Sequence, residues 1–146
     1  MNPPPPGSFA AIIDALGHGL PMLIVQVVAC AILLAIGVAI YMRLTPFHER
    51  EMVASGNSAA GTMLAGAILA LAIPLAAMLA TSASLFDIIV WGVVALVLQL
   101  LTLLIVSHAM RNFRAMIEAG NVAAAITLAG AQIAVALLNA AAMVPQ

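Results

Sequence analysis

Charged side chains are scarce in this chain. Only 6% of its 146 residues are charged, whereas 66% are hydrophobic, and the formal net charge is −1. A soluble domain carries roughly 25% charged residues, so a soluble fold of this size could not cover its surface with so few. The solvent around most of the chain must therefore be lipid. The near-neutral balance also excludes a basic face for nucleic acid.

Cysteine and the common catalytic motifs are scarce as well. Cys30 is the single cysteine, which excludes an intrachain disulfide, and its apolar run indicates a small buried hydrophobe. His48-Glu49-Arg50-Glu51 is one short run without a second set of ligands, so a solvated loop or a partner contact is favoured over a metal site. There is no Gly-rich phosphate loop, paired-carboxylate site or Ser-His-Asp grouping with a supporting context. We therefore expect no enzymatic activity, no cofactor and no metal.

Long apolar runs are what the chain has instead. Four of them are long enough to cross a bilayer as helices, which takes about 20 residues. A sheet edge would leave backbone groups open in lipid, and the runs are continuous rather than alternating, which disfavours a barrel. The sequence therefore predicts an all-α membrane protein with four transmembrane helices, near Pro21–Met42, Asn57–Ala80, Leu85–Ser107 and Asn121–Val144.

The chain before residue 20 has a different character. Pro3 to Pro6 cannot form a helix and predict a short extended tail. Ser8 can cap a short separate helix, Phe9–Leu16, lying at the membrane interface. We therefore divide the chain into this segment, 1–19, and two hairpins, 20–80 and 81–146.

All the arginines lie in two loops. Arg43 and Arg50 follow the first span, and Arg111 and Arg114 follow the third. An even number of spans separates these loops, so both lie on the same side, which the positive-inside rule assigns to the cytoplasm. Both termini are then expected outside.

An internal repeat is the most informative pattern. Gly56-Asn57 recurs as Gly120-Asn121, a shift of 64 positions (120 − 56) that matches residue types from Arg50 and Arg114 onward. The sequence therefore predicts two tandem helical hairpins. Because both hairpins enter the membrane in the same direction, they form a parallel repeat, which disfavours an inverted-repeat transporter.

Small residues concentrate in the second and fourth spans. They let helix backbones approach closely in lipid, so we place these two spans at the centre. The alternative is that the small residues face another subunit of a homo-oligomer, which the small size of the chain favours. The predicted packing positions are Gly61, Ala65, Gly66, Ala72, Ala76, Ala125, Ala129, Gly130, Ala136 and Ala140.

Amide side chains are the polar candidates. The two Gly-Asn pairs are typical of helix starts capped by Asn, with a polar vestibule as the alternative. Amides at membrane depth are typical of hydrogen bonds between helices, with a polar path as the alternative. No acidic or basic side chain falls in the predicted hydrocarbon centre, which argues against proton-coupled carriers and voltage sensors. The candidates are Asn57, Asn121, Gln132, Asn139, Gln26 and Gln99.

The two copies differ at a few positions. Pro74 should kink the second span, and the fourth span has no proline opposite it. Gln132 and Asn139 replace Ile68 and Leu75, which makes the fourth span more polar than the second. Any directional function would need such a difference.

The doubled motif resembles a known family. Gly-Asn-x-Ala-Ala followed by Leu-Ala-Gly, and the run from Trp91 to Leu100, are similar to the bacterial YjfL-type inner-membrane proteins, domain of unknown function 350. The resemblance covers nearly the whole chain after the Pro-rich tail. It implies tandem two-helix units in the bacterial cytoplasmic membrane and supplies no catalytic residue. It also implies a soluble partner linked to envelope stress or polyamines.

Two functional hypotheses follow. The first is an oligomeric channel or permease-like protein for a small solute or ion, with the inner spans along a narrow path. The second is a non-conducting membrane subunit that recruits a cytoplasmic partner through the loops Arg43–Ser55 and Ala109–Ala119.

Overall fold

The fold of the chain is helical in a computed structural model that describes residues 7–45, 48–82, 84–109 and 112–143. Within these ranges there are helices and turns but no strand, and four of the helices are long and apolar enough to cross a membrane. The predicted all-α class with four membrane-spanning helices is therefore confirmed. The Pro3–Pro6 tail, Arg111 and Val144 lie outside the described residues. The elements are α1 (Phe9–Leu44), α2 (Glu49–Ala54), α3 (Ser58–Thr81), α4 (Leu85–Ala109), α5 (Phe113–Glu118) and α6 (Val122–Met143).

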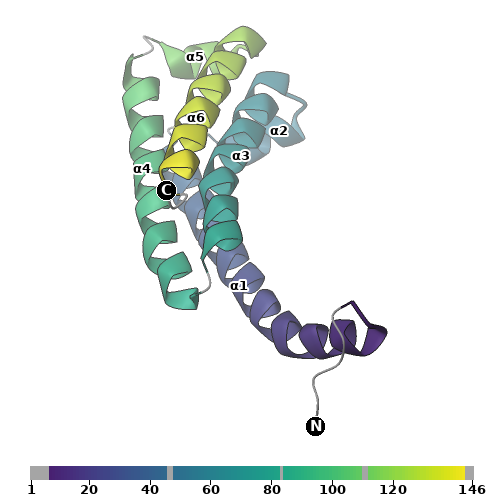
Figure 1. The fold of residues 1–146 in the computed structure, drawn as a ribbon. Coiled ribbons are helices and arrows are strands. Elements are labelled where there is room, and N and C mark those ends of the chain that lie inside the picture. Colours follow the sequence, from purple (N-terminus) through teal and green to yellow (C-terminus); the bar gives the residue numbers. More distant parts are fainter. Residues whose placement is uncertain (1–6, 46–47, 83, 110–111, 144–146) are drawn as a thin grey trace.

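The first helix is longer than the sequence predicts. Ser8 caps it as expected, accepting a hydrogen bond from the Ala11 amide at 3.2 Å. The separate helix Phe9–Leu16 is wrong, however, because α1 continues through Pro21 to Leu44. A proline removes one backbone hydrogen bond and bends a helix more readily than it ends one within an apolar run. Figure 1 shows the first part of α1 turning away from the bundle.

The four long helices are arranged around α3. This helix packs against α1, α4 and α6, and it is the most buried of the four. Because α1 and α6 each contact both α3 and α4, they lie on opposite sides of the α3–α4 pair (Figure 1). The predicted central position is thus confirmed for the second span. It is wrong for the fourth, since α6 lies at the edge of the chain with one face open.

Two short helices, α2 and α5, precede α3 and α6 and were not predicted from the sequence. Helix α2 packs on α3, and α5 packs on α6 and α3. Both lie at one end of the bundle, which we call the α2–α5 end. The other end, where α3 leads into α4, we call the turn end.

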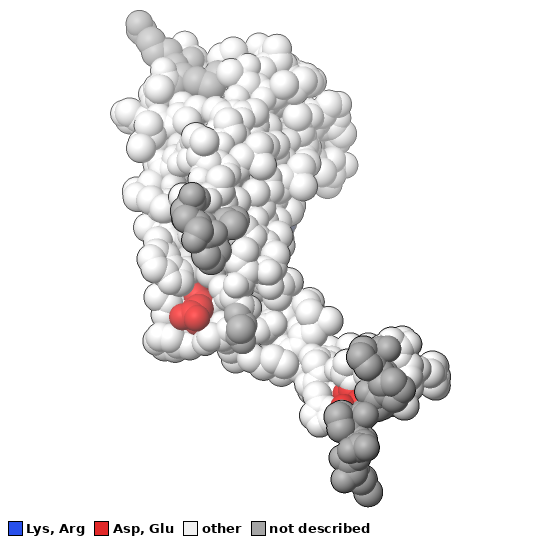
Figure 2. Space-filling view, in the orientation of Figure 1, with Lys and Arg blue, Asp and Glu red and all other residues white. Residues whose placement is uncertain are grey.

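The surface of the bundle is apolar. Large exposed hydrophobic side chains run along all four long helices, which suits contact with lipid tails. Figure 2 shows one face that is almost entirely uncharged, with acidic atoms near the turn end and on the first part of α1. These two regions contain Asp87 and Asp14.

The tightest packing lies between α3 and α6. A Cβ added at Gly66 would overlap the Ala129 Cβ and would lie 3.0 Å from the Ala129 Cα. Glycine at position 66 therefore allows the two backbones to approach, as the small-residue pattern predicts. Its repeat mate, Gly130, has no heavy atom within 4 Å of such an added Cβ.

Candidate functional site

The two Gly-Asn pairs form the same turn at the starts of α3 and α6. Gly56 and Gly120 have φ angles of 86° and 77°, a backbone conformation that favours glycine. The Asn57 and Asn121 side chains accept hydrogen bonds from the Ala60 and Ala124 amides at 3.0 and 3.1 Å, so both asparagines cap their helices. Asn57 alone also donates, through Nδ2, to the Ile117 carbonyl oxygen at 2.9 Å. This bond ties the start of α3 to α5.

A buried pair of glutamines joins α4 to α6. Gln99 Nε2 donates to the backbone oxygen of Gln132 at 2.8 Å. Both side chains are buried, and neither Gln99 Oε1 nor Gln132 Nε2 has a hydrogen-bond partner among the described residues. A buried acceptor on α4 and a buried donor on α6 are thus each left free, which is costly unless a polar molecule binds them.

The other two amides at depth lie elsewhere. Asn139 lies on α6 two turns beyond Gln132, so the two share a face of the helix. It is half-buried, and its Nδ2 has no partner in the described part of the chain. Gln26 is buried on α1, across the α3–α4 pair from α6.

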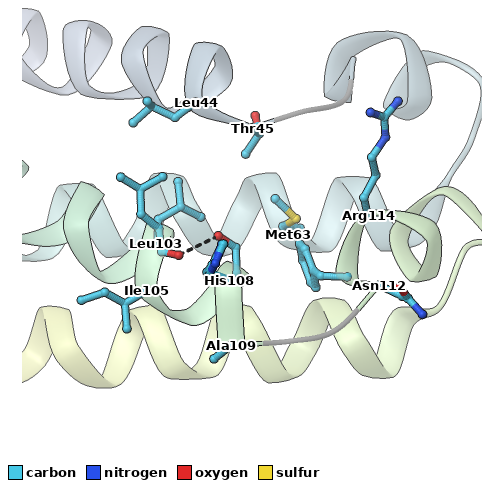
Figure 3. Close-up of a pocket in the computed structure, with 12 residues that line it drawn as sticks. Leu44, Thr45, Met63, Leu103, Ile105, His108, Ala109, Asn112 and Arg114 are labelled. Atoms are coloured by element: carbon cyan, nitrogen blue, oxygen red, sulfur yellow. Dashed lines mark hydrogen bonds between the residues drawn. The ribbon is translucent and has the colours of Figure 1, made fainter.

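Two cavities lie beyond these amides, one at each end of the bundle. The α5 cavity, at the α2–α5 end, has a volume of about 850 Å³. Figure 3 shows side chains from α1, α3, α4 and α5 around it, including Thr45, Met63, Leu103 and Arg114. The turn cavity, at the other end, has a volume of about 450 Å³ and is lined by Met78, Thr81, Ser82, Asp87, Trp91, Ala142 and Met143.

The free amides lie between the two cavities. On α4, Gln99 is one turn from Leu103 of the α5 cavity and about 12 Å along the helix from Trp91 of the turn cavity. On α6, Asn139 is one turn from Met143 of the turn cavity. The free polar atoms therefore form an interrupted row from one cavity toward the other.

A buried carboxyl group lies at the start of α2. Glu49 is 2% exposed, and its Oε1 accepts a hydrogen bond from the Tyr41 hydroxyl at 2.8 Å. The Thr45 hydroxyl donates to the Tyr41 carbonyl oxygen at 3.2 Å and can turn its single proton toward Glu49 instead. Burial raises the pKa of Glu49 to about 7, and the hydrogen bonds from Tyr41 and Thr45 partly offset this.

The sequence analysis missed this carboxyl group. It placed the run from His48 to Glu51 in a solvated loop or a partner contact. His48, Arg50 and Glu51 are exposed as expected, but the loop is wrong because α2 begins at Glu49, and Glu49 is buried. The signal was in the repeat, because the mate of Glu49 is Phe113, a residue type that is usually buried.

The predicted packing positions fall into two groups. On α6, Ala125, Ala129 and Ala136 are buried and Ala140 is half-buried, while Gly130 is exposed. On α3, Gly66 and Pro74 are buried, Gly61 and Ala72 are half-buried, and Ala65 and Ala76 are exposed. The stripe shared by the two helices is therefore covered on α6 and partly open on α3. Helix α3 continues through Pro74, and the kink expected there stays a prediction.

Four long apolar helices with buried amides between them define a multi-pass membrane protein. The family described as Domain of Unknown Function (DUF350) matches residues 15–143, and the chain belongs to this family. This confirms the resemblance noted from the doubled motif.

Two relatives are similar over most of their length. The chain is 34% identical over 104 residues to the UPF0719 inner membrane protein YjfL of Escherichia coli (strain K12), an alignment that covers 71% of this chain and 79% of the relative. The protein of the same name from Escherichia coli O157:H7 gives the same values. No solved structure matches the chain. With its four apolar helices, this chain is a multi-pass inner-membrane protein.

Proposed function

We propose that this protein is an oligomeric channel or permease-like protein that passes a small polar solute or ion and catalyses no reaction. The observation that carries the proposal is the pair of free amide atoms, Gln99 Oε1 and Gln132 Nε2, between a cavity at each end of the bundle. Unpaired polar atoms in lipid are costly, and polar groups at membrane depth commonly mark a path for polar substrates.

The chemistry of the pair favours a neutral solute. One free atom is an acceptor and the other a donor, so together they match water or a small amide or alcohol, which offers both. Among the described residues of the four long helices, the amide side chains that are buried or half-buried are Gln26, Gln99, Gln132 and Asn139. No Asp, Glu, Lys or Arg lies among the described buried residues of these helices, so nothing there would compensate the desolvation of an ion.

The open face of α6 supports an oligomer. Gly130 is exposed on this face with space around it, next to exposed Ile126 and Leu137. Small residues beside larger apolar ones allow close packing of helices in lipid, so a second copy of the chain could cover this face and complete the path.

We also propose that the α2–α5 end faces the cytoplasm. The described arginines, Arg43, Arg50 and Arg114, all lie at this end, as the positive-inside rule requires of a cytoplasmic side. Labelling of single cysteines introduced at Ser55 and Ser82 in intact cells tests the assignment. Ser82 should react with a membrane-impermeant reagent and Ser55 should not.

Solute flux into proteoliposomes tests the transport activity. Water, urea and glycerol are compared with K⁺ and Cl⁻, using the full chain and protein-free vesicles. We expect flux of neutral solutes above that of the empty vesicles, and a large loss in the double variant Gln99→Leu with Gln132→Leu. Thr102→Val is the matched control, since Thr102 is a polar residue of α4 whose hydroxyl bonds its own helix, to the Leu98 carbonyl. Absence of flux for every solute would overturn the proposal.

A second candidate is a membrane subunit that recruits a soluble partner. The exposed charged residues of α2 and α5 support it: Arg50, Glu51, Arg114 and Glu118, of which the last two form an ion pair with a distance of 2.7 Å. Cross-linking from these residues in cells, followed by pull-down, tests this candidate. Recovery of the same partner with Arg50→Ala and Arg114→Ala as with the parent chain would count against it.

A further inference from the structure

The buried carboxyl group of Glu49 plays no part in the proposed path. Its Oε1 is held by the Tyr41 hydroxyl at 2.8 Å, which joins the start of α2 to the end of α1. Its Oε2 is buried and has no hydrogen-bond partner among the described residues. The ion pairs in the described part of the chain are Asp14–His18 and Arg114–Glu118, so neither supplies a cation to Glu49.

The charged groups near Glu49 line the same cavity as Glu49, but the ion pairs of the described residues include none with it. Arg43 on α1 and His48, Arg50 and Glu51 next to it are all exposed. Helix α3, which packs against α2, contains no titratable or charged residue. A carboxylate in this position would therefore be buried without an ion-pair partner among the described residues, whereas the neutral acid avoids most of that cost.

The position of Glu49 connects it to two cavities. It lines a cavity of about 490 Å³, which we call the α2 cavity, together with Thr45. Thr45 also lines the α5 cavity, so Thr45 stands in the wall between them, next to Glu49 on the α2 side. Movement of α2 away from α1 would open this wall.

The second half of the chain offers an internal comparison. Phe113 begins α5 as Glu49 begins α2, and both side chains are buried. In the sequence, Ile105 and Ala109 take the positions in the second half that Tyr41 and Thr45 take in the first. An apolar residue therefore satisfies the packing at this position, and packing alone does not account for an ionisable group in the first half.

We propose that Glu49 is a proton-binding site that holds α2 against α1 when it is protonated and releases α2 when it ionises. The carboxylate takes up one proton from the aqueous phase and returns it, and no other reactant is needed. The protonated acid keeps the hydrogen bond from Tyr41 without a buried charge. Ionisation makes solvent the better environment, so α2 swings outward and the wall between the α2 and α5 cavities opens.

Hydrogen exchange of the α2 amides, in the full chain in lipid nanodiscs, tests the release. Because burial raises the pKa of Glu49 from 4.5 to about 7, opening should become easier across this interval. The measured quantity is the protection of the Glu49–Ala54 amides from hydrogen exchange, divided at each pH by that of Glu49→Gln. We expect this ratio to fall about tenfold per pH unit between pH 4.5 and about pH 7 and then to level off. The Glu49→Gln variant keeps the shape of the neutral acid and should stay protected throughout. The matched control Glu51→Gln, which removes an exposed carboxyl group of the same helix, should behave as the parent chain does.

Infrared titration of the carboxyl groups tests the proton itself and needs no loss of the glutamate. We expect one carboxyl band to titrate near pH 7 in the parent chain and in Glu51→Gln, and to be missing from Glu49→Gln. Tyr41→Phe should move its midpoint upward, because the Tyr41 hydrogen bond lowers the pKa of Glu49. A merely structural tyrosine would leave the midpoint unchanged. The proposal is overturned if no carboxyl group titrates there, or if α2 protection does not follow the titration. Neither measurement depends on transport, so this proposal and the proposed function fail separately.

Discussion

Glu49 begins α2 and Phe113 begins α5, 64 positions later, and the two halves of the chain share the turn that follows. The Asn57 and Asn121 amides each donate to the carbonyl oxygen five residues earlier at 2.9 Å, on Met52 and Met116. The two hairpins therefore share their backbone conformation at this turn. They differ in the buried side chain at the start of the short helix, which is a hydrogen-bonded acid in the first half and an aromatic ring in the second.

The difference extends along the bundle. Gly66 lies tightly against Ala129, whereas its mate Gly130 faces open space. The free amide of Gln132 also has no counterpart in the first half, where Ile68 takes the matching position. Each half thus has one helix of the central α3–α4 pair and one helix at the edge, but the matching helices α3 and α6 differ in position, so matching residues meet different surroundings.

Replacement of the Phe113 ring by an acid should have the largest effect on the free energy of unfolding. Phe113→Glu removes a buried aromatic side chain and places a carboxyl group in the second half of the chain, where Ile105 and Ala109 take the sequence positions of Tyr41 and Thr45 and have no hydrogen-bonding side chain. We expect the free energy of unfolding to fall by more than about 3 kcal/mol at pH 8, and by less at pH 5, where the acid is neutral. Unfolding by denaturing detergent, followed by circular dichroism, measures this. Equal losses at both pH values would show that the new carboxyl group is not buried.

The stability of the parent chain should depend on pH through Glu49. A raised pKa means that the folded chain holds the proton more tightly than the unfolded chain does. The resulting stability is fully present below pH 4.5 and is lost as the pH rises to about 7, by up to about 3 kcal/mol in total. The same unfolding assay between pH 4 and 8 should give a flatter profile for Glu49→Gln. An unchanged slope in that variant would assign the dependence to another group.

The two glycines should respond in opposite directions to alanine. Gly66→Ala forces α3 away from the Ala129 backbone and should cost about 1–3 kcal/mol. Gly130→Ala meets nothing within 4 Å and should gain up to about 1 kcal/mol from helix propensity. Both are measured by detergent unfolding of the monodisperse protein. Equal costs would mean that the face around Gly130 is covered in solution, and cross-linking would then be expected to recover an oligomer.

The two caps should differ by one hydrogen bond. Asn57→Ala and Asn121→Ala each remove a helix cap, which costs about 1 kcal/mol. Asn57→Ala also removes the bond to the Ile117 carbonyl, for roughly 1 kcal/mol more. Unfolding free energies of the two variants give the difference directly. If the two losses are equal, the link between α3 and α5 contributes nothing to stability.

The sequence predicted features that depend on neighbouring residues. The four apolar runs gave the spans because length and hydropathy decide them, and Ser8, Asn57 and Asn121 cap their helices because capping is a local interaction. Helices α2 and α5 were missed because six residues are too few for a hydrophobic period to emerge.

Features that depend on tertiary packing could not be read in this way. The burial of Glu49 depends on α2 lying against α1 and α3, and the neighbouring residues in the sequence do not indicate this; the one signal was Phe113, 64 positions later. Likewise, Gly66 and Gly130 stand in the same Leu-Ala-Gly-Ala segment, so only the position of each helix in the bundle makes one tight and the other open. The pairing of Gln99 with Gln132 required the register of α4 against α6.

The glutamine pair should have the smallest effect on stability. Removing one partner alone leaves buried polar atoms unpaired, so Gln99→Leu should cost about 1 kcal/mol. In the double variant Gln99→Leu with Gln132→Leu, the free Oε1 and Nε2 are both gone, and leucine has a similar size. The change should then be below about 1 kcal/mol, because replacing both buried polar groups by apolar ones can be nearly neutral. Detergent unfolding of the three proteins measures it. These amides could join helices or line the proposed path, and the double variant separates the two roles. If they only join helices, a variant as stable as the parent chain should still pass solute. A stable variant that passes no solute would therefore show that the amides line the path.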